Sequence, residues 1–225
     1  MQNTLRRSFI VEGKTLHSGL IVKVRVLPAR ADHGICFSRV DVDKKNHLIP
    51  ALYDKVSDTK LSTTITNSDG VSVQTIEHLM AAFAGTGIHN ATVELDGPEV
   101  PILDGSSVEF VQKILKVGFV ELGVPIRGYE VQKEILVEDG VAWARLKPAN
   151  KLSIDCVIDC SDTIIGMQQL SLQMTNGSFV RELCDSRTFC RETDISKLLS
   201  QGFAKGGSLE NAIVLTKDNI KNVGR

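Results

Sequence analysis

The sequence predicts an α+β protein made of two layered sheet-and-helix units, with a functional cleft at their interface. Two observations predict this class: strand patterns precede helix patterns in the first half of the chain, and the same order begins again after residue 125. We therefore expect an N-terminal unit over residues 1–125 and a second unit over residues 126–225.

Strands with one buried face are predicted in the first unit. Over residues 22–26, three valines alternate with lysine and arginine, and over residues 91–96 Ala, Val and Leu alternate with Thr, Glu and Asp. This two-residue period puts the apolar side chains on one face of a sheet.

An amphipathic helix is predicted between these strands. Apolar side chains recur at i, i+3, i+4 and i+7 over residues 76–83, with Thr75 as N-cap and Gly85 as stop. On a helical wheel, Glu77 and His78 lie about 100° and about 200° from the first apolar position. Both side chains therefore leave the centre of the buried stripe, close to the helix N-terminus.

A second helix is predicted by residues 106–109, Ser-Ser-Val-Glu, which match a capping box, and by Gly118 as its stop. Residues 123–125, Gly-Val-Pro, then interrupt the pattern and mark the boundary between the units. In the second unit we expect strands over residues 129–137, 142–146, 152–160 and 211–215, and short helices over residues 179–183 and 195–199.

The composition argues against several classes of function. The 26 Lys and Arg nearly balance the 27 Asp and Glu, and no long basic run marks a nucleic-acid surface. No segment reaches the length of a membrane span, and the apolar stretch near the N-terminus is too short for a signal peptide. We expect a cytoplasmic monomer.

The five cysteines are odd in number and form no CxxC pair, which favours reduced thiols. Cys156 and Cys160 lie in an alternating pattern over residues 152–160 that is typical of a half-buried strand. We expect both thiols to pack as small apolar side chains; a metal-binding pair is the alternative.

All five histidines lie within the first 89 residues. Glu77 immediately precedes His78, and hydrolytic zinc sites need such a pair: an imidazole ligand and a carboxylate that deprotonates bound water, whose pKa the metal lowers to about 7. On spacing alone, two solvent-facing residues are the better explanation of the pair, since it does not match HExxH. His33 and His47 are expected to be exposed, and His89 to mark a turn before a strand.

Six blocks, taken together and in order, resemble the UDP-3-O-acyl-N-acetylglucosamine deacetylases. In the first half they are GKTLHSG (13–19), SDTKLST (57–63), TIEHLMAA (75–82) and GPEVPILDGS (97–106). In the second half they are SRTF (186–189) and GFAKGGSLENAIV (202–214). The resemblance covers essentially the whole chain and is more specific than one Glu-His pair.

The resemblance implies zinc-dependent hydrolysis of the N-acetyl group of UDP-3-O-(3-hydroxyacyl)-N-acetylglucosamine to the free amine plus acetate, in lipid A biosynthesis. It implies one zinc ion with His78 as a ligand, Glu77 as the general base, and Thr188 as the residue that polarises the scissile carbonyl and stabilises the oxyanion. The acylated UDP-amino-sugar is the expected partner.

The same resemblance implies residues that line the sugar site and an apolar passage for the acyl chain: Leu16, Leu61, Ser62, Phe189, Ile195, Gly207 and Ser208. Structural alternatives stay open, with Leu61 and Ile195 in the core, Phe189 as a packing anchor and Gly207 in a turn. His17 resembles a family histidine near the site, with no ligand role assigned. Asp104 is either an exposed turn residue or a partner of the site residues.

The sequence departs from the family pattern in two ways. In family enzymes a His-Lys-x-x-Asp helix supplies two more zinc ligands, and a further histidine follows that helix. We expect all of these residues beyond residue 225. The chain is therefore expected to be C-terminally truncated and inactive. Cys160 stands where a large apolar or aromatic residue is expected near the uridine. The alternatives are a pseudo-enzyme that binds acylated UDP-sugar without turnover and a fragment that does not fold.

Overall fold

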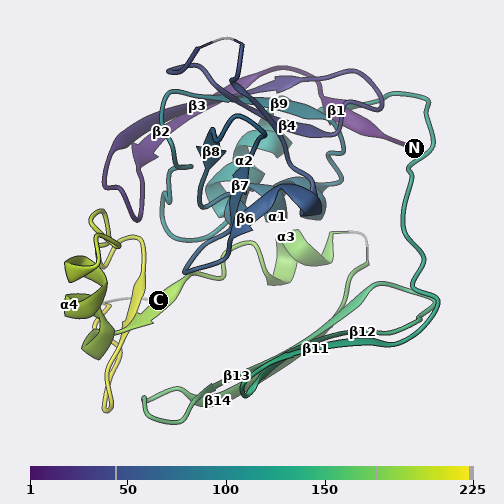
Figure 1. Cartoon of the computed structure of the whole chain (residues 1–225). Coiled ribbons are helices and arrows are strands. Elements are labelled where there is room, and N and C mark those ends of the chain that lie inside the picture. Colours follow the sequence, from purple (N-terminus) through teal and green to yellow (C-terminus); the bar gives the residue numbers. More distant parts are fainter. Residues whose placement is uncertain (44, 176, 223–225) are drawn as a thin grey trace.

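The computed structural model describes residues 1–43, 45–175 and 177–222, and its helices and sheets form separate layers (Figure 1). The α+β class is confirmed. The boundary near residue 125 stays a prediction, and residues 223–225 of the predicted second unit lie outside the described residues. Among the described residues, no helix combines the length and the apolar character needed to span a lipid bilayer.

The first half is built on a five-stranded sheet with the order β2-β3-β9-β4-β5. Its neighbours are antiparallel except β4 and β9, which are parallel. The strands are β2 (Phe9–Lys14), β3 (Ile21–Pro28), β4 (Ile35–Arg39), β5 (Leu48–Pro50) and β9 (Ala91–Leu95). The predicted alternation is confirmed, because Val22, Val24 and Val26 are buried while Lys23 and Arg25 between them are exposed.

A smaller sheet follows β5 and η1 (Tyr53–Lys55). It contains β6 (Val56–Asp58), β7 (Thr64–Thr66) and β8 (Ser72–Val73). The loop between β6 and β7 carries Leu61, which has a left-handed backbone conformation at φ +63°.

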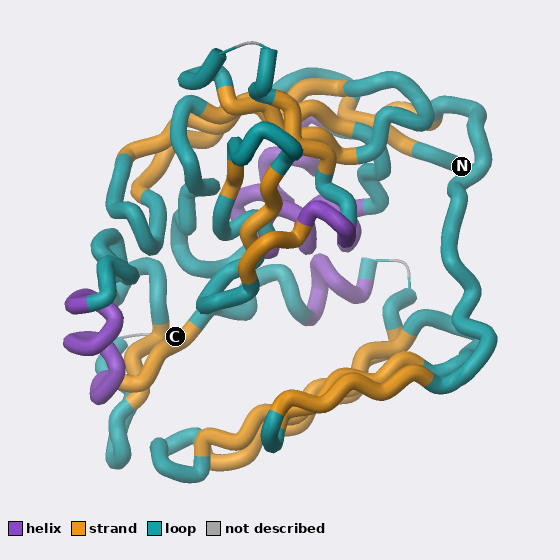
Figure 2. The backbone as a smooth tube through the Cα atoms, in the orientation of Figure 1, coloured by secondary structure: helices purple, strands orange, loops and turns teal. Residues whose placement is uncertain are grey.

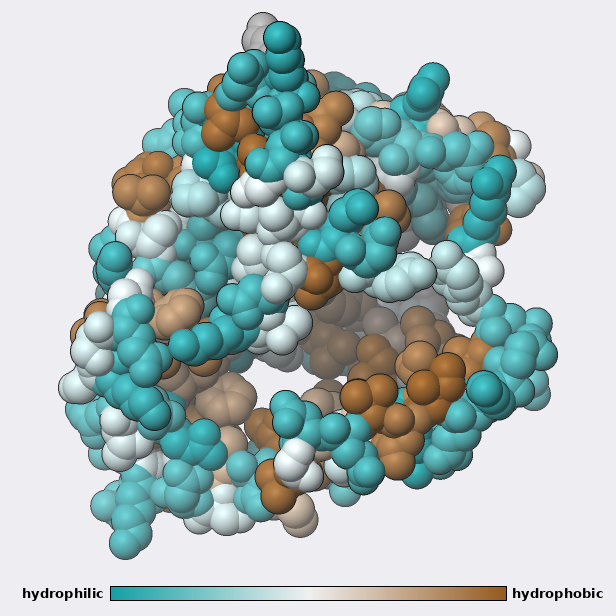
Figure 3. Space-filling view, viewed as in Figure 1, coloured by the Kyte–Doolittle hydropathy of each residue, from teal (hydrophilic) through white to brown (hydrophobic). Residues whose placement is uncertain are grey.

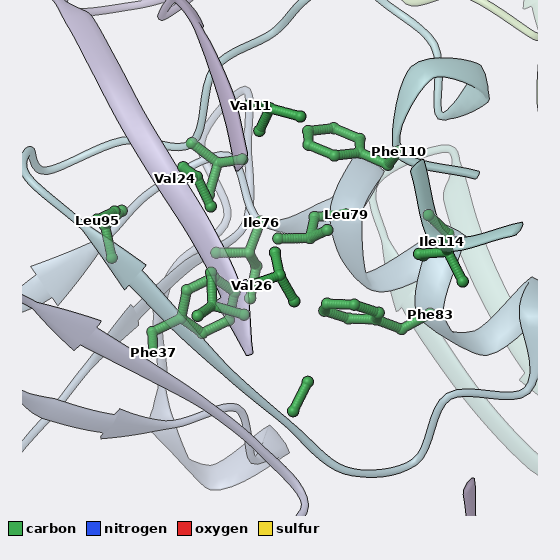
Figure 4. Close-up of a cluster of buried hydrophobic side chains, with 14 of the residues drawn as sticks. Val11, Val24, Val26, Phe37, Ile76, Leu79, Phe83, Leu95, Phe110 and Ile114 are labelled. Atoms are coloured by element: carbon green, nitrogen blue, oxygen red, sulfur yellow. The ribbon is translucent and has the colours of Figure 1, made fainter. Parts of the chain in front are cut away.

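Helices α1 (Glu77–Thr86) and α2 (Val108–Val117) pack together and share the main core with the five-stranded sheet. Figure 4 shows Val24 and Val26 of the sheet in one cluster with Leu79, Phe83 and Phe110 of the helices. Each such fully buried side chain stabilises the fold by about 1.5–3 kcal/mol.

The predicted start of α1 is wrong. Its N-cap residue is Ile76, which makes no side-chain capping bond. The Thr75 hydroxyl does not cap the helix but donates to the buried carboxylate of Glu99 at 3.1 Å. The capping role is lost because a tertiary acceptor takes the hydroxyl instead.

The predicted stop of α1 is also wrong. Gly85 lies inside the helix, which ends at Thr86 with Gly87 as the left-handed C-cap at φ +73°. Gly85 has a packing role, because a Cβ there would lie 2.0 Å from Phe179 Cδ1.

Helix α2 begins and ends close to the prediction, but no capping box forms. Ser107, the N-cap, donates its hydroxyl hydrogen bond to the carbonyl oxygen of His78 at 2.9 Å. Ser106 Oγ instead accepts from the Val108 amide at 3.1 Å. The predicted stop at Gly118 is confirmed, since this residue is the C-cap with φ +73°.

The chain then returns to its start, because β10 (Phe119–Glu121) pairs with β1 (Asn3–Leu5). Two antiparallel ribbons follow, drawn below α3 in Figures 1 and 2. They are β11 (Ile135–Asp139) with β12 (Ala142–Leu146), and β13 (Ser153–Cys160) with β14 (Gly166–Gln173). The strand predicted from residue 129 therefore begins only at residue 135.

The last elements are α3 (Ser178–Glu182), β15 (Phe189–Arg191), α4 (Glu192–Ser200) and β16 (Ile213–Leu215). Strands β15 and β16 are parallel. The two predicted short helices are confirmed within three residues at each end, and the predicted final strand is shorter by two residues.

The prediction of a half-buried strand over residues 152–160 is wrong for most of its length. Cys160 is buried, as expected, but Cys156 is exposed. The reason is that β13 pairs with β14 alone and most of the ribbon is in contact with solvent. Apolar side chains gather at this surface in Figure 3, and Val137, Leu152 and Leu170 are each more than half exposed.

Candidate active site

A largely apolar cavity of about 350 Å³ lies between loops of the first half and the segment from β15 to β16. The first half contributes Leu16 and His17 from the loop between β2 and β3, and Leu61 from the loop after β6. The later segment contributes Thr188, Phe189, Cys190, Ile195, Leu198, Leu199, Ala204, Lys205, Gly207, Ser208, Leu209, Ala212 and Val214.

Seven of the residues expected at the site line this one cavity: Leu16, Leu61, Thr188, Phe189, Ile195, Gly207 and Ser208. Ser62 does not line it; the residue is buried, and its hydroxyl accepts from Gln74 Nε2 at 2.9 Å. The core alternative for Leu61 is wrong, since this side chain is 49% exposed.

Helix α4 supplies an apolar stripe to the wall. Ile195, Leu198 and Leu199 follow the i, i+3, i+4 spacing of one helical face. Only Ile195 was expected at the site from the sequence, although the spacing over residues 195–199 was the signal for the other two. Cys190 was also missed, and nothing in its sequence surroundings marks it.

His17 is a further wall residue, only 6% exposed. Its Nδ1 accepts from the Ala204 amide at 3.4 Å, and its Nε2 has no hydrogen-bond partner in the described residues. The Phe203 ring meets the imidazole edge-on at 5.4 Å, and the Lys60 ammonium lies 4.9 Å from the Phe203 ring centre. These contacts connect the segments of His17 and Lys60 in the first half with the segment of Phe203 and Ala204 beside the cavity.

Glu77 and His78 lie in the first turn of α1 and do not line the cavity itself. Glu77 Oε2 accepts from the Thr63 amide at 3.0 Å, two residues after cavity-lining Leu61. Burial lowers the pKa of the His78 imidazole, and the nearby carboxylates of Glu77 and Asp104 partly oppose this. The neutral imidazole is therefore favoured.

Asp104 connects this pair to the cavity. Its carboxylate accepts from the amide and hydroxyl of Ser106 at 3.0 and 2.7 Å, so it is a turn residue and also an electrostatic neighbour of His78. The next residue, Gly105, accepts from the Thr188 amide at 2.8 Å. One turn thus lies between the proposed catalytic groups on α1 and the Thr188 side of the cavity.

The described residues form no cluster of potential metal ligands. No group of three or more His, Cys, Asp and Glu side chains within residues 1–43, 45–175 and 177–222 is arranged to hold a metal ion. Among the other histidines, His33 is exposed as predicted. His47 is only partly exposed, which corrects its prediction. His89 precedes β9 as predicted, and its Nδ1 accepts from the Asn3 amide at 3.1 Å.

Known proteins resemble this chain over nearly its whole length. The profile of a protein family described as UDP-3-O-acyl N-acetylglycosamine deacetylase matches residues 2–225. The UDP-3-O-acyl-N-acetylglucosamine deacetylase of Myxococcus xanthus is 44% identical over 221 residues, which are 98% of this chain and 70% of the relative. The proteins of the same name from Phenylobacterium zucineum and Nautilia profundicola are 40% and 41% identical, over 98% of this chain and 75% and 74% of the relatives.

Proposed function

We propose a specific reaction for this chain, which belongs to the UDP-3-O-acyl N-acetylglycosamine deacetylase family of hydrolytic enzymes. The proposed reaction is zinc-dependent hydrolysis of the N-acetyl group of UDP-3-O-(3-hydroxyacyl)-N-acetylglucosamine, which gives the free amine and acetate for lipid A biosynthesis. The proposed setting is the cytoplasm, and the proposed acting form is a monomer.

The single observation that carries this proposal is the cavity wall. Residues from two distant parts of the sequence, Leu16 and Leu61 on one side and Thr188 to Ser208 on the other, surround one apolar space. An apolar cavity with a few polar groups is the usual form of a small-molecule site. Its apolar wall suits an acyl chain, since each buried methylene contributes about 0.8 kcal/mol.

Glu77 is proposed as the general base. The Thr63 amide holds one oxygen of its carboxylate, and Oε1 has no hydrogen-bond partner among the described residues. A carboxylate oriented through one oxygen can accept a proton from water on the other. Thr188 is proposed to donate its hydroxyl hydrogen bond to the developing oxyanion, because it lines the cavity and its backbone is fixed by Gly105.

One zinc ion is the proposed cofactor, with His78 as a ligand. Zinc binds the neutral form of imidazole, which the lowered pKa of His78 favours. The bound ion would supply a Lewis acid for the acetyl carbonyl and a more acidic water. Catalytic zinc takes three protein ligands, and the described residues do not supply a group of three.

Acetate release from the substrate, measured with and without added Zn²⁺, tests the reaction. Zinc-dependent release that is lost in Glu77→Ala would support this reaction and would contradict the sequence-based expectation of an inactive chain. Binding of the acylated UDP-sugar without acetate release would instead support the alternative, a binding protein without turnover. Zinc stoichiometry, measured on the purified protein and on His78→Ala, tests the ligand assignment separately.

A further inference from the structure

Glu99 is a carboxylate with no exposed surface, and it does not line the cavity. A buried carboxylate is tolerated where donors satisfy its oxygens. Oε1 accepts from the His17 amide at 2.8 Å and from the Thr75 hydroxyl at 3.1 Å, and Oε2 accepts from the Ser18 amide at 2.8 Å. These three donors come from two separate segments, and both segments lead to the candidate site.

The first segment is the loop of residues 15–19, which Glu99 holds from one side. From the other side, the Lys205 amide donates to the His17 carbonyl at 3.2 Å, and the Gly206 amide donates to the Leu16 carbonyl at 3.0 Å. The approach is close, because a Cβ on Gly206 would lie 1.9 Å from the carbonyl oxygen of residue 15. The later wall of the cavity therefore docks on a loop whose peptide groups Glu99 orients.

The second segment leads into α1. Thr75 has φ +58°, a conformation that costs a β-branched residue energy and persists only when its surroundings hold it. Its hydroxyl bond to Glu99 is such a restraint. Glu77 follows two residues later, so the same carboxylate fixes the backbone that presents the Glu77 side chain.

We propose that Glu99 is a positioning residue that sets the cavity wall at His17 and the start of α1 at Thr75 relative to each other. It acts through these two segments without touching the substrate. The inference rests on the proposed function for the choice of ligand, but the geometry of the loop can be tested without that ligand.

The test compares the wild-type protein with Glu99→Gln, which keeps the shape of the side chain but turns an N–H donor toward another N–H donor. We expect hydrogen exchange of the His17 and Ser18 amides to accelerate at least about tenfold, while the core amide of Val24 keeps its rate. The Kd for UDP-3-O-(3-hydroxylauroyl)-N-acetylglucosamine should rise about tenfold. Unchanged exchange at both loop amides, or faster exchange with an unchanged Kd, overturns the proposal.

Two further variants keep the test decisive. Thr75→Val removes one donor and leaves Glu99 intact. We expect faster hydrogen exchange of the Thr63 amide, which donates to Glu77. An unchanged exchange rate of that amide overturns the link to α1, even if Glu99→Gln does not fold. Thr4→Val removes a buried hydroxyl that donates to the Asn90 carbonyl, and neither residue lines the cavity. An equal rise of Kd in Thr4→Val would show general destabilisation and overturn the proposal.

If the wild-type protein binds no such ligand, the proposed function fails, and the exchange rates alone decide the role of Glu99.

Discussion

The backbone oxygen of Asn211 lies so close to Gly105 that a Cβ at residue 105 would be 2.1 Å from it. Gly105 also has φ +86°, a conformation that favours glycine. This contact joins the turn before α2 to the segment before β16, beside the Thr188 amide that donates to the Gly105 carbonyl. Two parts of the chain that line or adjoin the cavity thus meet backbone to backbone.

Gly105→Ala is therefore expected to lower the free energy of unfolding by at least about 2–3 kcal/mol, because a backbone oxygen cannot move aside as a flexible side chain can. The measurement is equilibrium unfolding in urea. Gly123→Ala is the matched control, since Gly123 has φ +68° and a Cβ added there would meet no atom within 4 Å, and its cost should be about 1 kcal/mol. Equal losses in the two variants would contradict the close contact.

His89 is expected to make stability depend on pH. Burial lowers the pKa of this imidazole, with a smaller contribution from the N-terminal ammonium group, and Nδ1 accepts from the Asn3 amide. Because the folded-state pKa is depressed, the stabilisation is fully present above the unfolded value of about 6.5 and is lost as pH falls through the folded value.

The ring is only partly buried, so this loss should stay below about 1 kcal/mol after solvent screening. Urea unfolding at pH 7.5 and pH 5 measures it. His89→Gln offers an amide oxygen to the Asn3 amide and does not titrate, so the contribution of residue 89 should disappear from the difference between the two pH values. A pH dependence identical to that of the wild-type protein would refute the assignment to His89.

Local periodicity predicted the first half of the fold well. The alternation over residues 22–26 identified β3, and the stripe over residues 76–83 identified α1. It failed where contacts with residues distant in the sequence determine the hydrogen bonds of a side chain, as at Thr75, whose hydroxyl donates to Glu99 instead of capping the helix. It also failed at Cys156, because alternation cannot reveal whether another layer covers a strand.

The site residues came from the resemblance of sequence blocks and not from periodicity. Blocks far apart in the chain contribute Leu61 and Thr188 to one cavity, a meeting that no local pattern contains. The role of Glu99 was not predicted, because a glutamate between two prolines looks like an exposed loop residue. Only the three donors around its carboxylate mark it as buried.

Leu198→Trp should weaken binding of long acyl chains, because Leu198 lines the cavity from α4. Losing room for two methylene groups costs about 1.6 kcal/mol, which is about fifteenfold in Kd. Calorimetric titration with substrates of increasing chain length measures this. Lys197→Trp adds the same ring at the neighbouring exposed position, outside the lining, and should leave Kd unchanged. A loss that is the same for short and long chains would argue against an acyl passage here.

Glu77→Gln separates the proposed chemistry from structure. The amide oxygen of glutamine can still accept from the Thr63 amide, as Glu77 Oε2 does at 3.0 Å, so folding and substrate Kd should change little. Proton abstraction is lost, and kcat for acetate release should fall by about 10²–10⁴. Glu109→Gln is the control, because Glu109 is likewise an acidic residue in the first turn of its helix, α2. This variant tests whether loss of a negative charge near a helix N-terminus is enough to lower kcat. A comparable fall of kcat in both variants would remove Glu77 from the role of base.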